Sequence, residues 1–299
     1  MLLVKNYKQC MSKFLIIEKF PRLVDLRNIQ ICTFFNASCI KVMNKIYCLR
    51  ELEWALKNDA FAARIIGLTD IPDHSTLCIR LKKIENTAFF QVYKAFVFML
   101  KPDVRITSID STALRSSRFD SEAKSGKGTR LGWYTGYKLH LVSSCDLIPL
   151  AFDITTANVY DNNCEQLIKQ LDDHDIFALL GDAAYDSVKL FELCEQMSIH
   201  LLTDINLRRA KSVENIKNEY RIRNSLYLES PIGEKIYKHR ISVERLFSIL
   251  KMRYGLENPR LYGFNKYKSH VIWTLLLYLI EKLLDKDQGV ACNNFPWNK

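Results

Sequence analysis

Three acidic residues, Asp110, Asp182 and Glu244, stand where their carboxylates could share one chemical task. Asp110 follows the short β-branched run 104–109, and Asp182 follows the apolar run 176–180, so each is predicted to lie at the end of a strand. If those strands are neighbours, both side chains leave the sheet at the edge where open sheets bind ligands. A third acid, Glu244, would then come from a helix laid across the sheet near that edge.

The chemistry that suits such a set is metal-dependent cleavage of phosphodiester bonds. Two divalent cations about 3.5–4 Å apart make the attacking oxygen nucleophilic and stabilise the leaving oxygen. Mg²⁺ prefers carboxylate oxygens and retains waters, so a few Asp or Glu side chains suffice to hold it. Close carboxylates repel one another, and a bound cation removes that cost.

A helix predicted from about residue 233 to residue 252 carries further candidates. At 100° per residue, Tyr237, Arg240, Glu244 and Lys251 fall within a stripe of about 60°. An adjacent face is apolar and is formed by Val243, Leu246, Phe247 and Leu250. Arg240 can grip phosphate oxygens by its fork and Lys251 as a point charge, so the stripe could hold both a metal and a phosphate.

Each of these residues also has an ordinary structural interpretation. An Asp after a strand is often a turn residue or a helix cap. Glu244 could simply pair with Arg240 or Arg245, and a helix stripe of mixed charge is usually a solvated face. The combination of strand order, edge placement and stripe favours a shared site over separate coincidences.

The elements that must position these residues change in character near residue 104. Residues 1–100 are predicted to be mostly helical, and a DNA-binding module and a packing domain are both open interpretations. After residue 104 the pattern predicts three strands and then alternating helices and strands. The predicted strands are 104–109, 138–144, 148–154, 176–180 and 199–203, and the helices are 162–171, 186–197 and 233–252. This order predicts an α/β fold with a mixed sheet covered by helices on both faces.

Composition adds weaker constraints. The 299-residue chain has a net charge of +10, but residues 161–204 carry a local net of −8 and residues 206–260 one of +7, so the basic surplus collects around Glu244. A basic balance favours a polyanionic partner without deciding it. The nine cysteines form no CxxC pair or zinc-finger spacing, which predicts apolar packing in a reducing compartment. No signal-peptide core is evident, and the longest apolar stretch, Val271–Ile280, is too short to span a bilayer and is predicted to be a buried helix.

The spacing Tyr237-x2-Arg240-x3-Glu244-x6-Lys251 resembles the Y-R-E-K signature of bacterial insertion-sequence transposases, a group of DDE transposases with a ribonuclease-H-like core. Segments elsewhere agree with the same family over about residues 68–284. They are 109–112 (IDST), 136–140 (GYKLH), 155–161 (TTANVYD), 181–186 (GDAAYD) and 260–264 (RLYGF). Ala184 stands where a glycine is frequent, and the 62 residues from Asp182 to Glu244 leave little room for the β-rich insertion of some relatives.

This resemblance implies a ribonuclease-H-like mixed five-stranded sheet flanked by helices. It implies a helical, DNA-binding region at 1–100, a catalytic DDE domain at 101–285 and a C-terminal tail at 286–299. The activity implied is that of a transposase, which hydrolyses phosphodiester bonds at the ends of its element and joins the 3′-hydroxyls to target DNA. The partners implied are terminal inverted repeats, target DNA and a second copy of the protein, in the bacterial cytoplasm at the nucleoid and without a membrane.

The resemblance also assigns roles to residues. Asp110, Asp182 and Glu244 would be catalytic and would ligate two Mg²⁺ ions, for which Mn²⁺ could substitute. Tyr237, Arg240 and Lys251 would hold the DNA end.

The loop after Asp110 could follow a DNA backbone or could be an exposed loop. Its basic residues are Arg115, Arg118, Lys124, Lys127 and Arg130. Trp133 could stack on DNA or be a partly buried aromatic. His140 is more typical of a packed histidine than of a metal ligand. Asn158 and Asp161 could steady the ligands from behind or cap the following helix.

Two other functions remain open from the sequence. A nuclease with the same core would cut DNA without joining it, and an inactive relic of a mobile element would only bind DNA. Detection of strand joining separates the first function from a nuclease, and metal-independent binding without cleavage would favour the relic.

Overall fold

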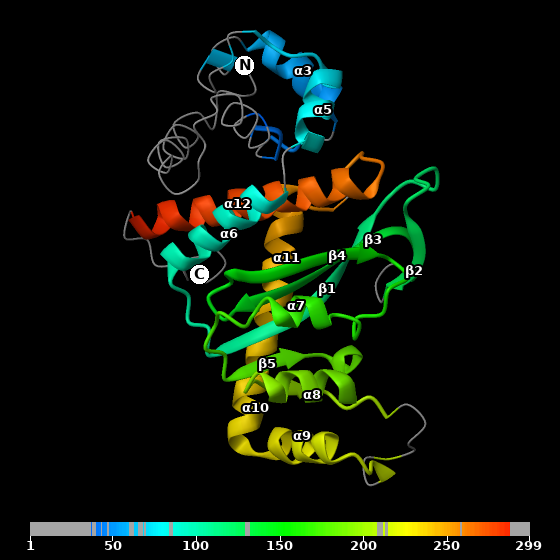
Figure 1. Cartoon of the computed structure of the whole chain (residues 1–299), viewed down its shortest axis with the longest axis vertical. Coiled ribbons are helices and arrows are strands. Elements are labelled where there is room, and N and C mark those ends of the chain that lie inside the picture. Colours follow the sequence, from blue (N-terminus) through cyan, green and yellow to red (C-terminus); the bar gives the residue numbers. More distant parts are fainter. Residues whose placement is uncertain are drawn as a thin grey trace. The chain divides into compact units, whose positions relative to one another are not determined.

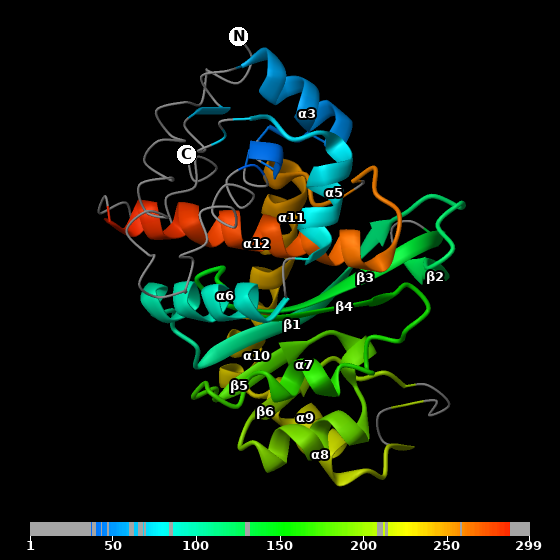
Figure 2. The ribbon, with the colours of Figure 1, turned by 45° about the horizontal axis from the view of Figure 1, so that its top comes forward.

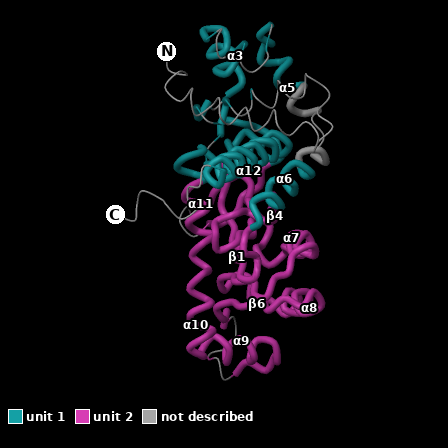
Figure 3. Tube along the Cα trace, turned by 90° about the vertical axis from the view of Figure 1, so that its left-hand side faces the viewer, with its two compact units in different colours: residues 1–101, 116–122, 250–299 teal, residues 102–115, 123–249 magenta. Residues whose placement is uncertain are grey.

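The computed structural model describes residues 37–287 except 38–39, 43, 47, 60–62, 65–67, 69, 84–85, 129–131, 208–211, 213–214 and 258. The chain forms two compact units, shown in Figure 3. One unit contains residues 102–115 and 123–249, and the other contains residues 1–101, 116–122 and 250–299. The predicted boundaries at 100 and 285 remain predictions about functional domains. They differ from this division, in which the C-terminal segment from 250 groups with the N-terminal helices.

The unit containing residues 102–115 and 123–249 is built on one mixed sheet (Figure 1). Its strands are β1 (Ile106–Arg115), β2 (Lys124–Gly128), β3 (Gly132–Ser144), β4 (Pro149–Thr156), β5 (Ala178–Gly181) and β6 (His200–Thr203). The order across the sheet is β2-β3-β1-β5-β6, and β4 also pairs with β3. Strands β1, β3 and β4 are antiparallel neighbours, whereas β5 and β6 run parallel to β1. The predicted mixed sheet is confirmed, with β2 as an additional strand.

The apolar sequence of the parallel strands follows from their burial. Every residue of the four-residue strand β5 is buried, as expected for a central strand covered on both faces. Figure 3 shows the strands between α10 and α11 on one side and α7 and α8 on the other. The helices of this half are α7 (Glu165–Lys169), α8 (Val188–Gln196), α9 (Glu219–Glu229), α10 (Pro231–Tyr237) and α11 (Ile241–Tyr254).

The predicted continuous helix 233–252 is wrong in one respect. It is divided into α10 and α11 by a 3₁₀ turn at Lys238–Arg240. Within this turn the carbonyl of His239 accepts a hydrogen bond from the Ser108 hydroxyl (3.2 Å), a partner outside the helix. The apolar face of α11 is otherwise as predicted, and Val243, Leu246 and Leu250 are fully buried.

Three other differences concern element boundaries. Strand β1 continues to Arg115, because it pairs with β3 as far as Gly136. The loop predicted after Asp110 contains β2. Helix α9 was not predicted, because its described interior buries only the polar Asn224 and has no apolar periodicity.

The other unit is helical in its described part. Its main helices are α3 (Leu49–Asn58), α5 (His74–Lys83), α6 (Asn86–Leu100) and α12 (Phe264–Asp287). Leu52, Leu56 and Leu77 join α3 and α5 in one core, and α12 packs against α5 and α6 (Figure 2). The run Val271–Ile280 lies inside α12 and is fully buried, as predicted. Among the described residues, no helix is both long and apolar enough to cross a membrane.

Candidate active site at the end of the β1–β5 pair

Asp110 and Asp182 occupy equivalent positions on the two neighbouring parallel strands. The last residues paired between β1 and β5 are Ser108 and Leu180. Each aspartate lies two residues beyond its paired residue, so both occur where the two strands part. The prediction that Asp110 ends its strand is therefore wrong, since β1 continues, but the predicted neighbourhood of β1 and β5 is confirmed.

The Asp110 side chain lies largely out of solvent. Its Oδ1 accepts a hydrogen bond from the backbone N–H of Ser111 at 2.7 Å. The pKa of Asp110 is raised to about 7, first by burial and then by the negative charges of Asp182, Glu244 and Asp161, against the lowering effect of that hydrogen bond. Asp182 and Glu244 therefore each act electrostatically on Asp110.

Asp182 is held by the turn that follows β5. Its Oδ1 accepts from the Ala184 N–H at 2.9 Å and so caps the 3₁₀ turn Ala183–Tyr185. Burial raises the pKa of Asp182, as does the charge of Asp161, while Arg240 lowers it. Asp182 can therefore cap this turn and also ligate a cation, because Oδ1 accepts the capping hydrogen bond and Oδ2 is the other carboxylate oxygen.

Glu244 stands in the first turn of α11 and is the most exposed of the three acids. Its Oε1 accepts from Arg240 Nη1 at 2.7 Å, and the two side chains are 46% and 28% exposed. The Arg240 guanidinium also lies 5.9 Å from the Tyr237 ring centroid and is influenced by the charge of Asp110. Arg240 therefore places a positive charge among these acids, and the ordinary ion pair weighed from the sequence is present.

A fourth carboxylate, Asp161, belongs to the same neighbourhood. It follows β4, and Lys138 Nζ donates to it at 3.0 Å and to the Val159 carbonyl at 2.9 Å. The helix cap considered for Asp161 is wrong, because α7 begins after Cys164. His140 Nε2 lies 3.0 Å from Thr155 Oγ1, and burial lowers the pKa of His140 to about 4, which is the packed histidine expected.

Tyr185 is a residue of this neighbourhood that the sequence did not single out. Its hydroxyl is buried and has no hydrogen-bond partner among the residues that the structure describes. Burial raises its pKa well above the usual value, and the charges of Asp110, Asp161 and Asp182 act in the same direction. Only its place in the segment GDAAYD could have indicated it.

These residues fit a hard cation by their chemistry. Asp110 and Asp182 offer oxygen donors whose pKa values are raised by burial and by other carboxylates, so a nearby divalent cation would relieve an existing cost. In the part of the chain that the structure describes, however, no three His, Cys, Asp or Glu side chains are already arranged to hold a metal ion. The pair of Glu244 with Arg240 is consistent with this finding, because that carboxylate is engaged elsewhere.

A comparison with models of protein families identifies the family of this chain. The model of the transposase DDE domain matches residues 101–280, which is more than half of the chain. The chain belongs to the transposase DDE domain family.

Other comparisons add little to that assignment. A solved structure described as a pre-cleavage Mos1 transpososome is similar at 12% identity and a TM-score of 0.23, covering 81% of this chain and 79% of that one. No curated protein sequence matches the chain.

Within the DDE domain, the hydroxyl of Tyr237 is already hydrogen-bonded to the protein and is not free to contact DNA. This hydroxyl donates to the Gly181 carbonyl at 2.8 Å and accepts from the Asp204 N–H at 3.1 Å. Gly181 directly precedes Asp182. The phenol therefore ties the end of β5 to the segment after β6.

Tyr237→Phe is expected to slow DNA cleavage about tenfold and to lower the free energy of unfolding by about 1 kcal/mol, because one buried hydrogen-bond bridge is lost. The salt dependence of DNA binding should not change. Cleavage rates and binding titrations at several salt concentrations measure both. Weaker DNA binding at every salt concentration, with unchanged cleavage at saturating DNA, would instead assign the Tyr237 hydroxyl to a contact with DNA.

Three of the other predicted DNA-binding residues are exposed on the β1–β2–β3 part of the sheet. Arg115 ends β1, and Lys124 and Lys127 lie on β2, all with exposed side chains. Trp133, opposite Lys127 in the β2–β3 hairpin, is 74% exposed, so the partly buried alternative is wrong. The remaining three residues are Arg118, which lies over the Phe119 ring, Lys251, which lies 3.9 Å from Glu257, and Arg130, which falls outside the described residues.

Gly126 explains why the hairpin lies against the segment that carries Asp161. A Cβ at Gly126 would meet the Ala157 carbonyl oxygen at 2.0 Å, so only glycine permits this approach. The basic, aromatic hairpin is thereby fixed to the backbone just before Asp161.

Proposed function

We propose that the protein is a DNA transposase of an insertion sequence. It binds the terminal inverted repeats of its element, hydrolyses phosphodiester bonds at the ends and joins the 3′-hydroxyls to target DNA. The observation that carries this proposal is the coupling of Asp110 to Asp182 and Glu244 in a chain of the DDE family. A homodimer on DNA, formed at the bacterial nucleoid, belongs to the same proposal.

The residues divide the work as follows. Asp110 and Asp182 would hold divalent cations, and Glu244 would complete the ligand set after exchanging its Arg240 partner. Bound Mg²⁺ or Mn²⁺ would supply a nucleophilic oxygen and stabilise the leaving one, as two-metal sites do. Arg240, once released, is suited to a phosphate next to the cut, because its fork matches two phosphate oxygens. Lys251, about two turns beyond Glu244 along α11, would bind a phosphate as a point charge.

The β2–β3 hairpin would follow the DNA backbone. Lys124 and Lys127 are exposed on one strand, and the exposed Trp133 ring can stack on a base or a sugar. The hairpin starts from the strand that pairs with β1, so it leaves the same part of the sheet as Asp110.

The double change Lys124→Gln/Lys127→Gln is expected to weaken DNA binding at physiological salt. The slope of log affinity against log salt should fall by about two units, because two phosphate contacts are lost. Fluorescence anisotropy over a salt series measures this slope. The matched control is Lys169→Gln/Lys189→Gln, which removes the same charge from exposed positions in the acidic region 161–204. Equal slopes for the two double variants would contradict a DNA-tracking hairpin.

The proposed function is tested by single-turnover assays on linear DNA that carries the sequences flanking the gene. Cleavage at fixed positions in Mg²⁺ or Mn²⁺, but not in EDTA, followed by joining of the 3′-ends to a plasmid, is the expected result. Cleavage without joining would assign a nuclease of the same core. DNA binding without cleavage in either metal would overturn the enzymatic proposal and leave a DNA-binding relic.

A further inference from the structure

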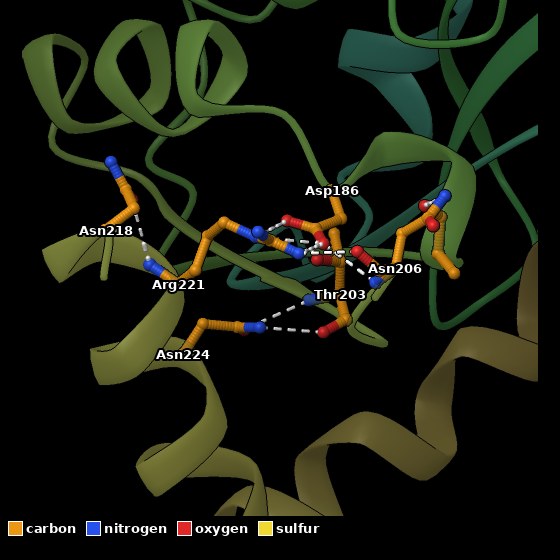
Figure 4. A network of polar contacts seen from close by, with 7 residues as sticks. Asp186, Thr203, Asn206, Asn218, Arg221 and Asn224 are labelled. Atoms are coloured by element: carbon orange, nitrogen blue, oxygen red, sulfur yellow. Dashed lines mark hydrogen bonds and ion pairs between the residues drawn. The ribbon is translucent and has the colours of Figure 1, made fainter. Parts of the chain in front are cut away.

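A buried ion pair lies directly behind the turn that carries Asp182. Asp186 is fully buried, and the side chain of Arg221, at the start of α9, is 13% exposed. Arg221 Nε donates to Asp186 Oδ1 at 2.9 Å, and Nη2 donates to Oδ2 at 2.7 Å, so the contact is a bidentate fork (Figure 4). Two charges have been taken out of water at this place, which is costly unless their geometry is well matched.

The ion pair also engages the segment after β6. The Asn206 N–H donates to Asp186 Oδ2 at 2.7 Å, and the Asn206 carbonyl accepts from Arg221 Nη2 at 2.6 Å. The Asn206 side chain reaches back to the Ala183 carbonyl at 3.4 Å, inside the turn capped by Asp182. Three segments that are separate in the sequence therefore meet at one buried pair.

A second contact fixes α9 to the same strand end. Asn224, one turn after Arg221, donates from Nδ2 to the Thr203 carbonyl at 2.7 Å and accepts from the Thr203 N–H at 3.1 Å. Figure 4 shows these contacts beside the pair of Arg221 with Asp186. The face of α9 that packs against the sheet is thus polar. Its side chains bind the Thr203 backbone and the Asp186 carboxylate, which explains why the buried residue of this helix is an asparagine.

Stability alone does not explain such a pair. Apolar side chains of similar volume often replace a buried ion pair with no loss of stability, whereas a fork with directional hydrogen bonds fixes relative positions. The fixed object here is the turn 182–186, which begins with Asp182. On its other side the same turn is held by Tyr237 through Gly181.

We propose that Asp186 and Arg221 are positioning residues that, through Asn206, hold the turn carrying Asp182 in the geometry the active site requires. This inference rests on the proposed function for its catalytic consequence, but the holding of the turn can be measured without any activity. Neither residue touches the reacting DNA.

The test replaces both members of the pair at once, as Asp186→Leu/Arg221→Met, so that no unpaired charge is left buried. The variant is expected to unfold cooperatively, close to the wild type. Hydrogen exchange at the amides of residues 182–186 should become at least about tenfold faster. The maximal cleavage rate should fall about 100-fold with the apparent KM for DNA unchanged, because a displaced ligand affects the reacting geometry and not DNA binding.

Two further variants keep the test decisive. Arg221→Lys retains the charge without the bidentate contact and should give exchange and cleavage rates between those of the wild type and the double variant. If the double variant does not fold, the same two measurements on Arg221→Lys test the positioning role. The matched control is Glu195→Leu/Arg223→Met, which removes an exposed ion pair (2.8 Å) between Glu195 on α8 and Arg223 on α9. It should leave exchange and cleavage as in the wild type.

Each result decides something different. Unchanged exchange at 182–186 in a folded variant would overturn the positioning role, as would faster exchange with an unchanged cleavage rate or an equal loss in the Glu195/Arg223 control. If the wild type cleaves no DNA while exchange still becomes faster in the variant, the turn is held as inferred and the proposed function is what fails.

Discussion

Asp110→Asn is expected to abolish metal-dependent cleavage and, without divalent metal, to make the protein more stable at pH 8. Cleavage should fall by at least about 10³-fold, because a neutral amide cannot balance a cation at a site that depends on charge. DNA binding in EDTA should persist. A loss of activity together with a gain in stability is characteristic of a residue kept for function at a cost to folding.

The gain in stability follows from the raised pKa. Burial and neighbouring carboxylates raise the pKa of Asp110 from 3.8 to about 7, so between these values the folded protein holds a proton that the unfolded chain has lost. Stability from this group is therefore complete below pH 4 and is lost as the pH rises towards 7. The loss amounts to at most about 1.4 kcal/mol per pH unit. Asparagine keeps the acceptor for the Ser111 N–H and removes the charge.

Denaturant unfolding in EDTA at pH 5, 6, 7 and 8 measures this effect. The difference in unfolding free energy between Asp110→Asn and the wild type should grow with pH and level off above 7. The matched control is Asp153→Asn, on β4, whose Oδ1 accepts from the N–H of the next residue at 2.8 Å as Asp110 does. That control should cleave DNA normally. A difference that does not change with pH would show that Asp110 carries no raised pKa, and wild-type cleavage would remove it from the site.

The sheet, and the closeness of Asp110 to Asp182, could be predicted from the sequence because both depend on local patterns. A short apolar run such as Ala178–Gly181 marks a buried parallel strand, and an acid just beyond it is directed to one edge. The same reasoning found β1, although its continuation to Arg115 depends on pairing with β3, which is not a local property. Glu244 was found by spacing and resemblance together.

The rest of the site depends on contacts that leave no periodic pattern. At the break between α10 and α11, the His239 carbonyl accepts a hydrogen bond from the Ser108 hydroxyl, 131 residues away in the sequence. Arg221 and Asp186 are 35 residues apart, and α9 lacks the apolar stripe by which a helix is recognised. Tyr237 was assigned to DNA from its place in the signature, whereas in the structure its hydroxyl binds Gly181. The polar contacts that position the site residues therefore could not be predicted from the sequence, whereas the apolar pattern of the strands could.

Glu244→Gln is expected to abolish cleavage by at least about 10³-fold while leaving folding almost unchanged. The carboxylate is 46% exposed, and its pair with Arg240 is of the surface kind, so loss of the pair should change the free energy of unfolding by less than about 1 kcal/mol. This response contrasts with that of Asp110, whose removal stabilises the protein. DNA binding in EDTA should become a few-fold tighter, because the Arg240 guanidinium is released for a phosphate.

The matched control is Glu234→Gln, which breaks another exposed pair across one helical turn, that of Glu234 with Lys238 at 2.7 Å. It should retain both cleavage and DNA affinity. Single-turnover cleavage in Mg²⁺ and binding titrations in EDTA give the two readouts for each variant. Cleavage by Glu244→Gln within about tenfold of the wild type would leave Glu244 with no role beyond its ion pair.

Arg240→Gln separates the two roles of Glu244, because it breaks the same ion pair from the other side. If pairing were all that Glu244 does, Glu244→Gln and Arg240→Gln would slow cleavage at saturating DNA equally, whereas the proposed site predicts the larger loss for Glu244→Gln, which removes a metal ligand. The proposed site predicts opposite effects on binding: Arg240→Gln should weaken it and lower the salt slope by about one unit, whereas Glu244→Gln should not weaken it. A carboxylate that is held by arginine before DNA arrives, and is needed by the cation afterwards, would account for the observed pair and for the lack of a preformed three-ligand metal site among the described residues.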